Sequence, residues 1–352
     1  MDRRTVDVYE TRAAEWATRK SPGALDPAAG FAARCAPGAL RADLGCGPGW
    51  HGPALGAPLL ALDAAGAMLD LVVDHAPGAL RVQATVDALP LRRASLHGAW
   101  ANKVYMHLAM AALPRALADL HGALVVGAPL HLRVTSDRIG PAPDTEFPGR
   151  HFEYWSAARL ADVLIGAGFS IEGLRDDGEE WLDAECVRER MLPDVVGPGM
   201  RLLVCGLNPS LYAADVGIGF ARPGNRFWPA ALGAGILTVD RDPAHALRVN
   251  RVGMTDLVKR ATARADELLG YEYAEGAARL TRLVEWLRPA ALCFVGLAGY
   301  REVVDRRARP GVQPAPFAGV PTYVMPNTSG LNARTPLGEL TEHLRAAAAL
   351  GA

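Results

Sequence analysis

Short apolar runs alternate with amphipathic stretches along the first half of the chain. The pattern predicts buried strands at residues 39–44, 59–63, 80–83, 97–101 and 131–135, and helices at 65–75, 109–121 and 156–167. Alternation of strands and helices is typical of a mainly parallel sheet covered by helices on both faces. The first half is therefore expected to be an α/β domain.

An acidic stretch that becomes rich in proline and glycine, residues 176–198, marks the predicted domain junction. Beyond it, strands are predicted at 201–206, 290–295 and 321–325, and helices at about 227–235, 276–287 and 336–349. We therefore expect an α/β protein of two three-layer α/β/α domains, at residues 1–180 and 199–352, with a linker and lead-in at 181–198.

Composition and charge narrow the class of protein. The 352-residue chain is 50% hydrophobic and 21% charged, which excludes a disordered or fibrous protein. Residues 1–190 hold 19 basic and 24 acidic side chains, whereas residues 191–352 hold 18 and 14. The second half is the better candidate for binding a polyanion, although many proteins with such a charge never do so.

Five cysteines are present, and no two of them form a C-x-x-C pair. This pattern disfavours a zinc ribbon, an iron–sulfur cluster and a disulfide framework, so we expect reduced thiols and no metal site. The N-terminal residues lack the apolar segment of a signal peptide, and no apolar run approaches about 18 residues. The expected location is the cytoplasm, without membrane contact.

A glycine-rich loop follows the first predicted strand. It reads Asp43-Leu44-Gly45-Cys46-Gly47-Pro48-Gly49, where glycines let backbone N–H groups approach a ligand closely. A dinucleotide fingerprint needs a later glycine at the position of Trp50, which argues against NAD or FAD. Asp63 ends the second strand, where it can bind ribose hydroxyls, and Asp87 follows the third, where it can accept from an adenine amine.

Over about residues 5–175 this pattern resembles the class I S-adenosylmethionine-dependent methyltransferases, whose sheet is Rossmann-like. The resemblance implies that S-adenosylmethionine is the cofactor, with Asp63 on its ribose and Asp87 on its adenine. The early segment with Tyr9, Glu10 and Trp16 is similar to the helix that covers such sites. Gly45, Gly47 and Gly49 would flank the methionine part, and Asp43 is assigned to the same cofactor site. The alternative is that the glycines only make a tight turn.

The methyl acceptor is not specified by the sequence. Residues 101–105 read Ala-Asn-Lys-Val-Tyr in place of the N-P-P-[YF] of amino-directed DNA methyltransferases, and no Pro-Cys nucleophile exists. DNA base methylation is therefore disfavoured. Lys103, Tyr105 and His107 could line an acceptor pocket, or equally lie on the face of a helix.

Four ordered motifs occupy the second half, and strand-end loops of an open α/β sheet converge on one crevice. They are the loop Leu203–Ser210 with Asn208-Pro209, the segment Gly219–Trp228, the segment Gly253–Val258 with Thr262 after it, and the loop Met325–Asn332. Together they resemble the mismatch-specific uracil/thymine DNA glycosylases of the uracil-DNA glycosylase superfamily, over about residues 191–350. Double-stranded DNA with G·U or G·T mismatches is the implied partner, and no cofactor is implied.

The resemblance implies a role for each matching residue. Asn208 would position the hydrolytic water, Phe220 would stack on the extruded pyrimidine, and main-chain groups near Leu207 and Phe220 would read the edge of the base. A wedge that enters the helix, with supporting residues, would comprise Asn327, Ser329, Gly330, Leu331 and Asn332. Beside these motifs, Arg222, Arg226 and Arg334 could contact phosphates or remain solvated.

Several residue types limit the chemistry. Asn208 cannot act as a general base at neutral pH, and the motifs lack a histidine that could assist it. They also lack a lysine for a Schiff base, which favours base removal without strand cleavage. Asp256 stands where the relatives have an uncharged or basic residue, so its carboxylate could accept from the N3–H of a base or repel DNA.

We expect a mismatch-specific uracil-DNA glycosylase fused to a methyltransferase-like domain that binds S-adenosylmethionine and serves an unknown acceptor. In one alternative, the methyltransferase acts on a small molecule or RNA, and the second half is a catalytically silent recognition module. In another, the protein only binds damaged or unusual DNA.

Overall fold

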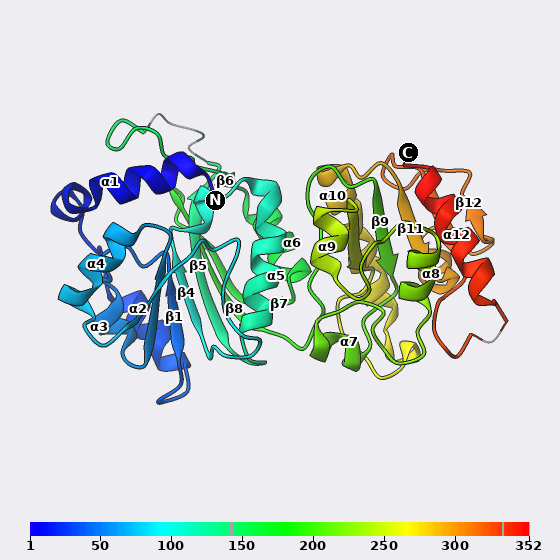
Figure 1. Ribbon diagram of the computed structural model, residues 1–352, viewed down its shortest axis with the longest axis horizontal. Helices are drawn as coiled ribbons and strands as arrows, with labels where there is room; N and C mark the ends of the chain where they lie inside the picture. The colour runs from blue at the N-terminus through cyan, green and yellow to red at the C-terminus, as the bar shows by residue number, and fades with distance from the viewer. Residues whose placement is uncertain (139, 141–143, 333, 352) are drawn as a thin grey trace. The chain divides into compact units, whose positions relative to one another are not determined.

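The computed structural model describes residues 1–138, 140, 144–332 and 334–351, which form two compact units (Figure 1). The N-terminal unit comprises Met1–Ile165 and Phe169–Glu189, and the C-terminal unit comprises Gly166–Gly168 and Arg190–Ala352. The division after Glu189 falls inside the stretch that the sequence marks as a junction. The first half of the expected linker, however, is a regular strand of the N-terminal unit.

The N-terminal unit has one mixed sheet, with strand order β3-β2-β1-β4-β5-β8-β7 and a short β6 beside β5. Its strands are β1 (Arg41–Leu44), β2 (Leu59–Asp63), β3 (Leu80–Gln83), β4 (Ala99–Asn102), β5 (Pro129–Ser136), β6 (Tyr154–Trp155), β7 (Phe169–Asp176) and β8 (Trp181–Arg188). Strands β1 to β6 pair in parallel, whereas β8 runs antiparallel to both β5 and β7. β1 is buried along its whole length, as expected of a strand covered on both faces.

Helices cover this sheet, and one of them lies across the ends of its strands. They are α1 (Arg3–Arg19), α2 (Asp26–Arg34), α3 (Gly52–Leu55), α4 (Gly66–His75), α5 (Leu113–Ala123) and α6 (Ala157–Gly166). α1 begins at an N-cap, Asp2, whose carboxylate accepts from the backbone N–H of Thr5, and it passes over the strand ends at the top of Figure 1. α1 therefore covers the carboxyl ends of β1 and β2.

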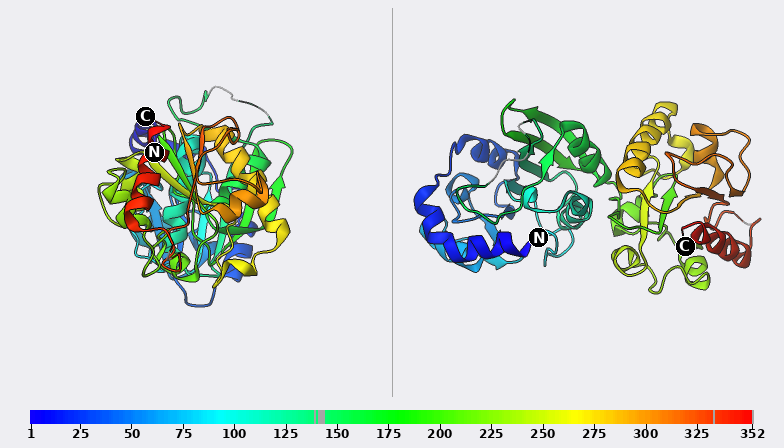
Figure 2. Two further views of the ribbon diagram at one scale, coloured as in Figure 1. Left: turned by 90° about the vertical axis from the view of Figure 1, so that its right-hand side faces the viewer. Right: turned by 90° about the horizontal axis from the view of Figure 1, so that it is seen from above.

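The C-terminal unit has a second sheet, ordered β10-β9-β11-β13-β12, in which only β12 is antiparallel to its neighbour. The strands are β9 (Leu202–Gly206), β10 (Val252–Asp256), β11 (Leu292–Val295), β12 (Gly311–Val312) and β13 (Thr322–Met325). The helices are α7 (Leu211–Val216), α8 (Phe227–Gly233), α9 (Pro243–Arg248), α10 (Gly270–Leu287), α11 (Leu297–Val303) and α12 (Leu337–Ala349). Figure 2 shows α10 and α12 on opposite sides of this sheet.

The prediction of two α/β domains, each with helices on both faces of a sheet, is confirmed. The main difference from the prediction is the β7–β8 hairpin, because the sequence predicts a linker at residues 181–188 where the structure has strand β8. Along β8 every second residue is buried, while Asp183 and Glu185 lie on the less buried face. Acidic residues on one face of a half-exposed strand gave this segment the composition of a linker.

The described residues contain no helix long and apolar enough to cross a membrane, and no cluster of histidine, cysteine and acidic side chains arranged to hold a metal ion. All five cysteines are buried and unpaired, which agrees with the expectation of thiols rather than disulfides.

Candidate active sites of the two units

In the N-terminal unit, a cavity of about 610 Å³ opens at the carboxyl ends of the parallel strands. Its lining includes Gly45 and Gly47 after β1, Asp63 at the end of β2, and Tyr9 and Trp16 from α1. These are residues that the sequence assigned to a cofactor site and its cover. The fold therefore gathers at one cavity five residues that the sequence placed in three separate segments.

Asp63 fixes the glycine loop by two hydrogen bonds. The backbone N–H of Gly47 donates to Oδ2 and that of Ala65 to Oδ1, each at 2.9 Å. Burial raises the pKa of Asp63, and these backbone donors oppose the rise. The carboxylate remains on the cavity wall with lone pairs left for further donors, which is the requirement for binding ribose hydroxyls.

The glycines have different structural roles. Gly45 has φ +66°, and a Cβ there would lie 2.4 Å from Cγ2 of Val104, so a larger residue does not fit. Gly49 has φ +83° and packs against Val72 of α4, away from the cavity lining. Gly49 therefore serves the packing of the loop against a helix.

Asp43 is 2% exposed, and its Oδ2 has no hydrogen-bond partner in the described structure. Burial, with a further contribution from Asp63, raises its pKa to about 8. Asp43 is not part of the cavity lining, so its carboxyl group lies behind the glycine loop and not on the cavity wall.

Asp87 follows β3 as the sequence analysis expected, but its carboxylate forms an ion pair with the amino group of Met1. Its pKa is lowered overall, because hydrogen bonds from the amino terminus and Thr85 outweigh the effect of burial. The cavity is lined by the neighbouring Val86 rather than by Asp87. Reaching an adenine amine would require Asp87 to exchange its present partner.

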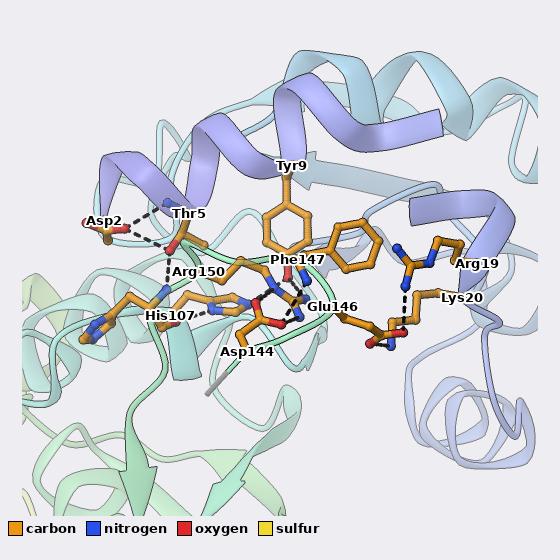
Figure 3. Close-up of polar contacts among 11 residues, drawn as sticks. Asp2, Thr5, Tyr9, Arg19, Lys20, His107, Asp144, Glu146, Phe147 and Arg150 are labelled. Carbon is orange, nitrogen blue, oxygen red and sulfur yellow. Dashed lines mark hydrogen bonds and ion pairs between the residues drawn. The ribbon is translucent and has the colours of Figure 1, made fainter. Parts of the chain in front are cut away.

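A polar network links α1 to the far wall of the cavity (Figure 3). Arg150 donates to both carboxylate oxygens of Asp144, at 2.7 and 3.0 Å, and its Nη1 donates to the hydroxyl of Tyr9 at 3.1 Å. Tyr9 in turn lies 3.1 Å from Nε2 of His107, whose Nδ1 lies 2.6 Å from the carbonyl oxygen of His151. Nδ1 must therefore donate, so Nε2 accepts the proton of Tyr9.

His107 is held neutral at the cavity, because burial lowers its pKa to about 4. Lys103 also lines the cavity, with its ammonium 3.9 Å from the ring centre of Trp181. Tyr105, by contrast, is fully buried in the core and is absent from the cavity lining, which corrects the suggestion that it lines a pocket. Neither Arg150 nor Asp144 is predicted from the sequence, because both belong to no recognisable motif.

In the C-terminal unit, Asn208 sits on the loop after β9 with its side-chain amide clamped. Nδ2 donates to Oγ1 of Thr262 at 2.7 Å and to the carbonyl of Arg260 at 3.1 Å. Both amide hydrogens are thereby used, and Oδ1 has no partner among the described residues. The free oxygen can accept a hydrogen bond from a water molecule. Leu207 anchors the same loop, since its carbonyl accepts from Val258 N–H at 2.9 Å.

Phe220 adopts φ +58°, an unfavourable conformation for a bulky side chain. Its ring stacks on that of the buried Phe227, with centroids 4.3 Å apart. The loop that carries Phe220 is held by a hydrogen bond from the buried Trp228, whose indole N–H donates to the carbonyl of Gly219 at 2.8 Å. Strained backbone held by a rigid support is typical of functional sites.

Asp256 ends β10, beside Gly206 at the end of β9, and is only 7% exposed. It also lines a small cleft with Phe220. Since the carboxylate is buried, it cannot act as an exposed charge that repels the DNA backbone, the second of the two roles left open by the sequence.

The loop after β13 presents Leu331, which is 86% exposed, the most exposed of the large hydrophobic side chains described. The loop is braced internally: Asn327 Oδ1 accepts from Ser329 N–H at 3.0 Å, and Asn332 Nδ2 donates to the Asn327 carbonyl at 2.8 Å. Gly330 packs so closely that a Cβ would lie 2.8 Å from the Gly224 carbonyl. A rigid loop with an exposed apolar tip has the geometry of a wedge.

Arginines beside the motifs divide into two kinds. Arg226 donates to the carbonyls of Thr335, at 2.6 Å, and of Ser329, at 3.2 Å. It braces the loop that carries Leu331, and both terminal nitrogens of its guanidinium are bonded within the protein. Arg334 and Arg222 are exposed.

The only lysine in the C-terminal unit, Lys259, is buried in an ion-pair cluster. Its ammonium donates to Asp194 Oδ1 at 2.7 Å, while Arg279 donates to Asp194 Oδ2 at 2.6 Å. Burial alone would raise the pKa of Asp194, but the two cations lower it overall. Lys259 is therefore committed to a structural pair and is not available as a nucleophile.

Comparison with known proteins agrees with this division. Residues 193–349 match the family model of the uracil DNA glycosylase superfamily, and residues 42–131 match that of a methyltransferase domain. The chain therefore carries a glycosylase-superfamily domain and a methyltransferase domain, two classes of enzyme.

Among solved structures, the chain is similar to an S-adenosylmethionine-dependent methyltransferase from Mesorhizobium loti, at 20% identity over 47% of this chain and 99% of that one, with a TM-score of 0.41. It is also similar to the Burkholderia thailandensis 1,6-didemethyltoxoflavin-N1-methyltransferase with bound 1,6-didemethyltoxoflavin and S-adenosylhomocysteine. That match has 18% identity over 52% and 88% of the two chains, with a TM-score of 0.41.

Proposed function

We propose that the C-terminal unit is a DNA glycosylase that hydrolyses the N-glycosidic bond of mispaired uracil in duplex DNA, with mispaired thymine as a second substrate. The observation that carries the proposal is the clamped amide of Asn208, whose Oδ1 has no partner in the part of the chain that the structure describes, while Phe220 lies on another loop of the same unit. The match to the glycosylase superfamily supports the same assignment.

The chemistry follows from these groups. Oδ1 of Asn208 orients a water molecule, whose oxygen bonds to C1′ of the sugar as the bond from C1′ to the base breaks. The electron pair leaves with the base, and the proton lost by the water passes to solvent or to the released base. Asparagine accepts a hydrogen bond but takes no proton, so the reaction depends on a good leaving group such as the uracil anion.

Recognition of a mismatch rests on the cost of extruding the base. A mispaired nucleotide costs less to extrude than a paired one, and Leu331 can fill the gap that it leaves. Phe220 then offers a ring face to the extruded pyrimidine. Because Lys259 is already paired with Asp194, the enzyme removes the base without forming a Schiff base or cutting the strand.

The test is base release from labelled duplexes that contain G·U, G·T or A·U, followed by alkaline cleavage. Wild-type protein should release uracil from G·U, and Asn208→Ala should lose most of this activity while keeping its affinity for DNA. Asn250→Ala, which changes an asparagine far from the loop, serves as the matched control. Retained DNA binding with no base release from any duplex would reject the proposal in favour of a recognition module.

A second function is supported by a separate observation in the N-terminal unit. The carboxylate of Asp63 lines the cavity at the end of β2 and fits the hydroxyl donors of S-adenosylmethionine. Asp63 would hold the ribose hydroxyls, the glycine loop would flank the methionine part, and the bound cofactor would supply the methyl group. Calorimetric titration with S-adenosylmethionine and S-adenosylhomocysteine tests this, and the absence of binding to both would reject it.

A further inference from the structure

Asp256 and Phe220 face each other across a single glycine. A Cβ placed on Gly206 would lie 2.3 Å from Oδ1 of Asp256 and 3.4 Å from Cζ of Phe220. The carboxyl group and the edge of the aromatic ring therefore share one wall, and any side chain at position 206 would separate them. A base stacked on Phe220 would present its edge to the carboxyl group.

The carboxyl group of Asp256 has no hydrogen bond or ion pair to any described residue. The cations nearby are used elsewhere: Lys259 and Arg279 both donate to the carboxylate of Asp194. Arg279 reaches Asp256 only at its main-chain oxygen, at 2.9 Å. A buried carboxyl group without partners is costly, and such groups are retained where a ligand completes their hydrogen bonds.

The electrostatic surroundings favour the uncharged form. The charged and titratable groups that face Asp256 are Asp194 from the lead-in, Lys259 after β10, Arg279 from α10 and Cys205 from β9. Burial raises the pKa of Asp256 to about 6 and Asp194 adds to the rise, while Lys259 and Arg279 oppose it. Below about pH 6 this carboxyl group is mostly neutral, and a neutral carboxyl group can donate a hydrogen bond as well as accept one.

The imide edge of a pyrimidine base is bound best by a group that donates one hydrogen bond and accepts another. Uracil presents the donor N3–H beside the acceptor O4, and a neutral carboxyl group offers an acceptor beside a donor. An ionised carboxylate accepts from N3–H but repels O4. The two protonation states of one side chain therefore differ in how well they bind the same base.

We propose that Asp256 reads the imide edge of the extruded base as a neutral carboxylic acid, and that its ionisation weakens the excision of uracil. This inference rests on the glycosylase function proposed above. It assigns to Asp256 a contact with the substrate and makes bases with an imide edge the class that the pocket recognises.

The experiment measures single-turnover release of uracil from a G·U duplex between about pH 5 and about pH 8.5. The wild-type rate should fall by about tenfold or more between about pH 5.5 and about pH 8. Asp256→Asn keeps an acceptor and a donor at every pH, so its rate should stay level and exceed the wild-type rate at about pH 8. Asp240→Asn, a change to an exposed carboxylate, should reproduce the wild-type profile.

Two outcomes would overturn the inference while leaving the glycosylase intact. One is a wild-type rate that does not fall across this range, which needs no variant to establish. The other is an Asp256→Asn protein that falls in parallel with the wild type. If no protein releases uracil at any pH, the proposed function fails and this inference fails with it.

Discussion

The side-chain amide of Asn208 donates a 2.7 Å hydrogen bond to the hydroxyl of Thr262, a residue 54 positions further along the chain. A second hydrogen bond, to the carbonyl of Arg260, fixes the plane of the amide. The orientation of Oδ1 of Asn208 is therefore set mainly by the segment that follows β10.

Replacement of Thr262 by valine should disturb this orientation while the Asn208 side chain itself is kept. We expect Thr262→Val to lower the single-turnover rate on a G·U duplex by about tenfold, because the shortest of the hydrogen bonds that hold the amide is lost. Affinity for the duplex should change little. Thr262→Ser restores the hydroxyl and should recover most of the rate, and failure of serine to do so would argue against the clamp.

Leu331 should contribute to the rate of uracil release from duplex substrates but not from single-stranded ones. Because its side chain is almost fully exposed, Leu331→Ala should leave the unfolding temperature unchanged. Release of uracil from a G·U duplex should fall by about tenfold, since the extruded state loses the group that fills the gap. A single-stranded uracil substrate needs no wedge and provides the internal comparison. An equal loss on both substrates would contradict this role.

Asp63 should control binding of S-adenosylmethionine. Asp63→Ala removes both the acceptor facing the cavity and the two hydrogen bonds that hold the glycine loop. We expect the dissociation constant measured by calorimetry to rise by about tenfold to hundredfold, the range for hydrogen bonds to a charged group. Asp70→Ala, on the exposed side of α4, is the matched control and should bind as the wild type does.

The Asp194 cluster should dominate the acid sensitivity of the C-terminal unit. Arg279→Met leaves a buried carboxylate with one cation, and we expect the free energy of unfolding to fall by about 3–5 kcal/mol. Arg345→Met, which breaks an exposed pair with Glu342, should have little effect.

The direction of the pH effect follows from the lowered pKa of Asp194. A carboxyl group with a lower pKa in the folded state stabilises the fold above its ordinary pKa, and this stability is lost as the pH falls. Chemical denaturation of the wild type between about pH 6 and about pH 3 should therefore show declining stability. In Arg279→Met the decline should be smaller, and an unchanged decline would contradict the assignment.

Much of both sites follows from local sequence. Glycines and an acid at strand ends predicted the loop at Gly45 and Gly47 and the place of Asp63. The ordered motifs predicted the loops of Asn208, Phe220 and Leu331. These signals are readable because strand periodicity and turn residues act over a few neighbouring positions, and parallel strands bring their carboxyl ends to one edge.

Other features depend on contacts between distant parts of the chain, which leave no local pattern. The hydroxyl of Tyr9 meets His107, 98 positions away, and Arg150, 141 positions away. The sequence placed Asp256 in the base pocket but left its role open. Only the tertiary structure shows that Asp256 is buried and that both neighbouring cations donate to Asp194, which leaves the carboxyl group of Asp256 without a partner among the described residues. Burial and the sharing of charges are properties of packed elements, so the fold decided them.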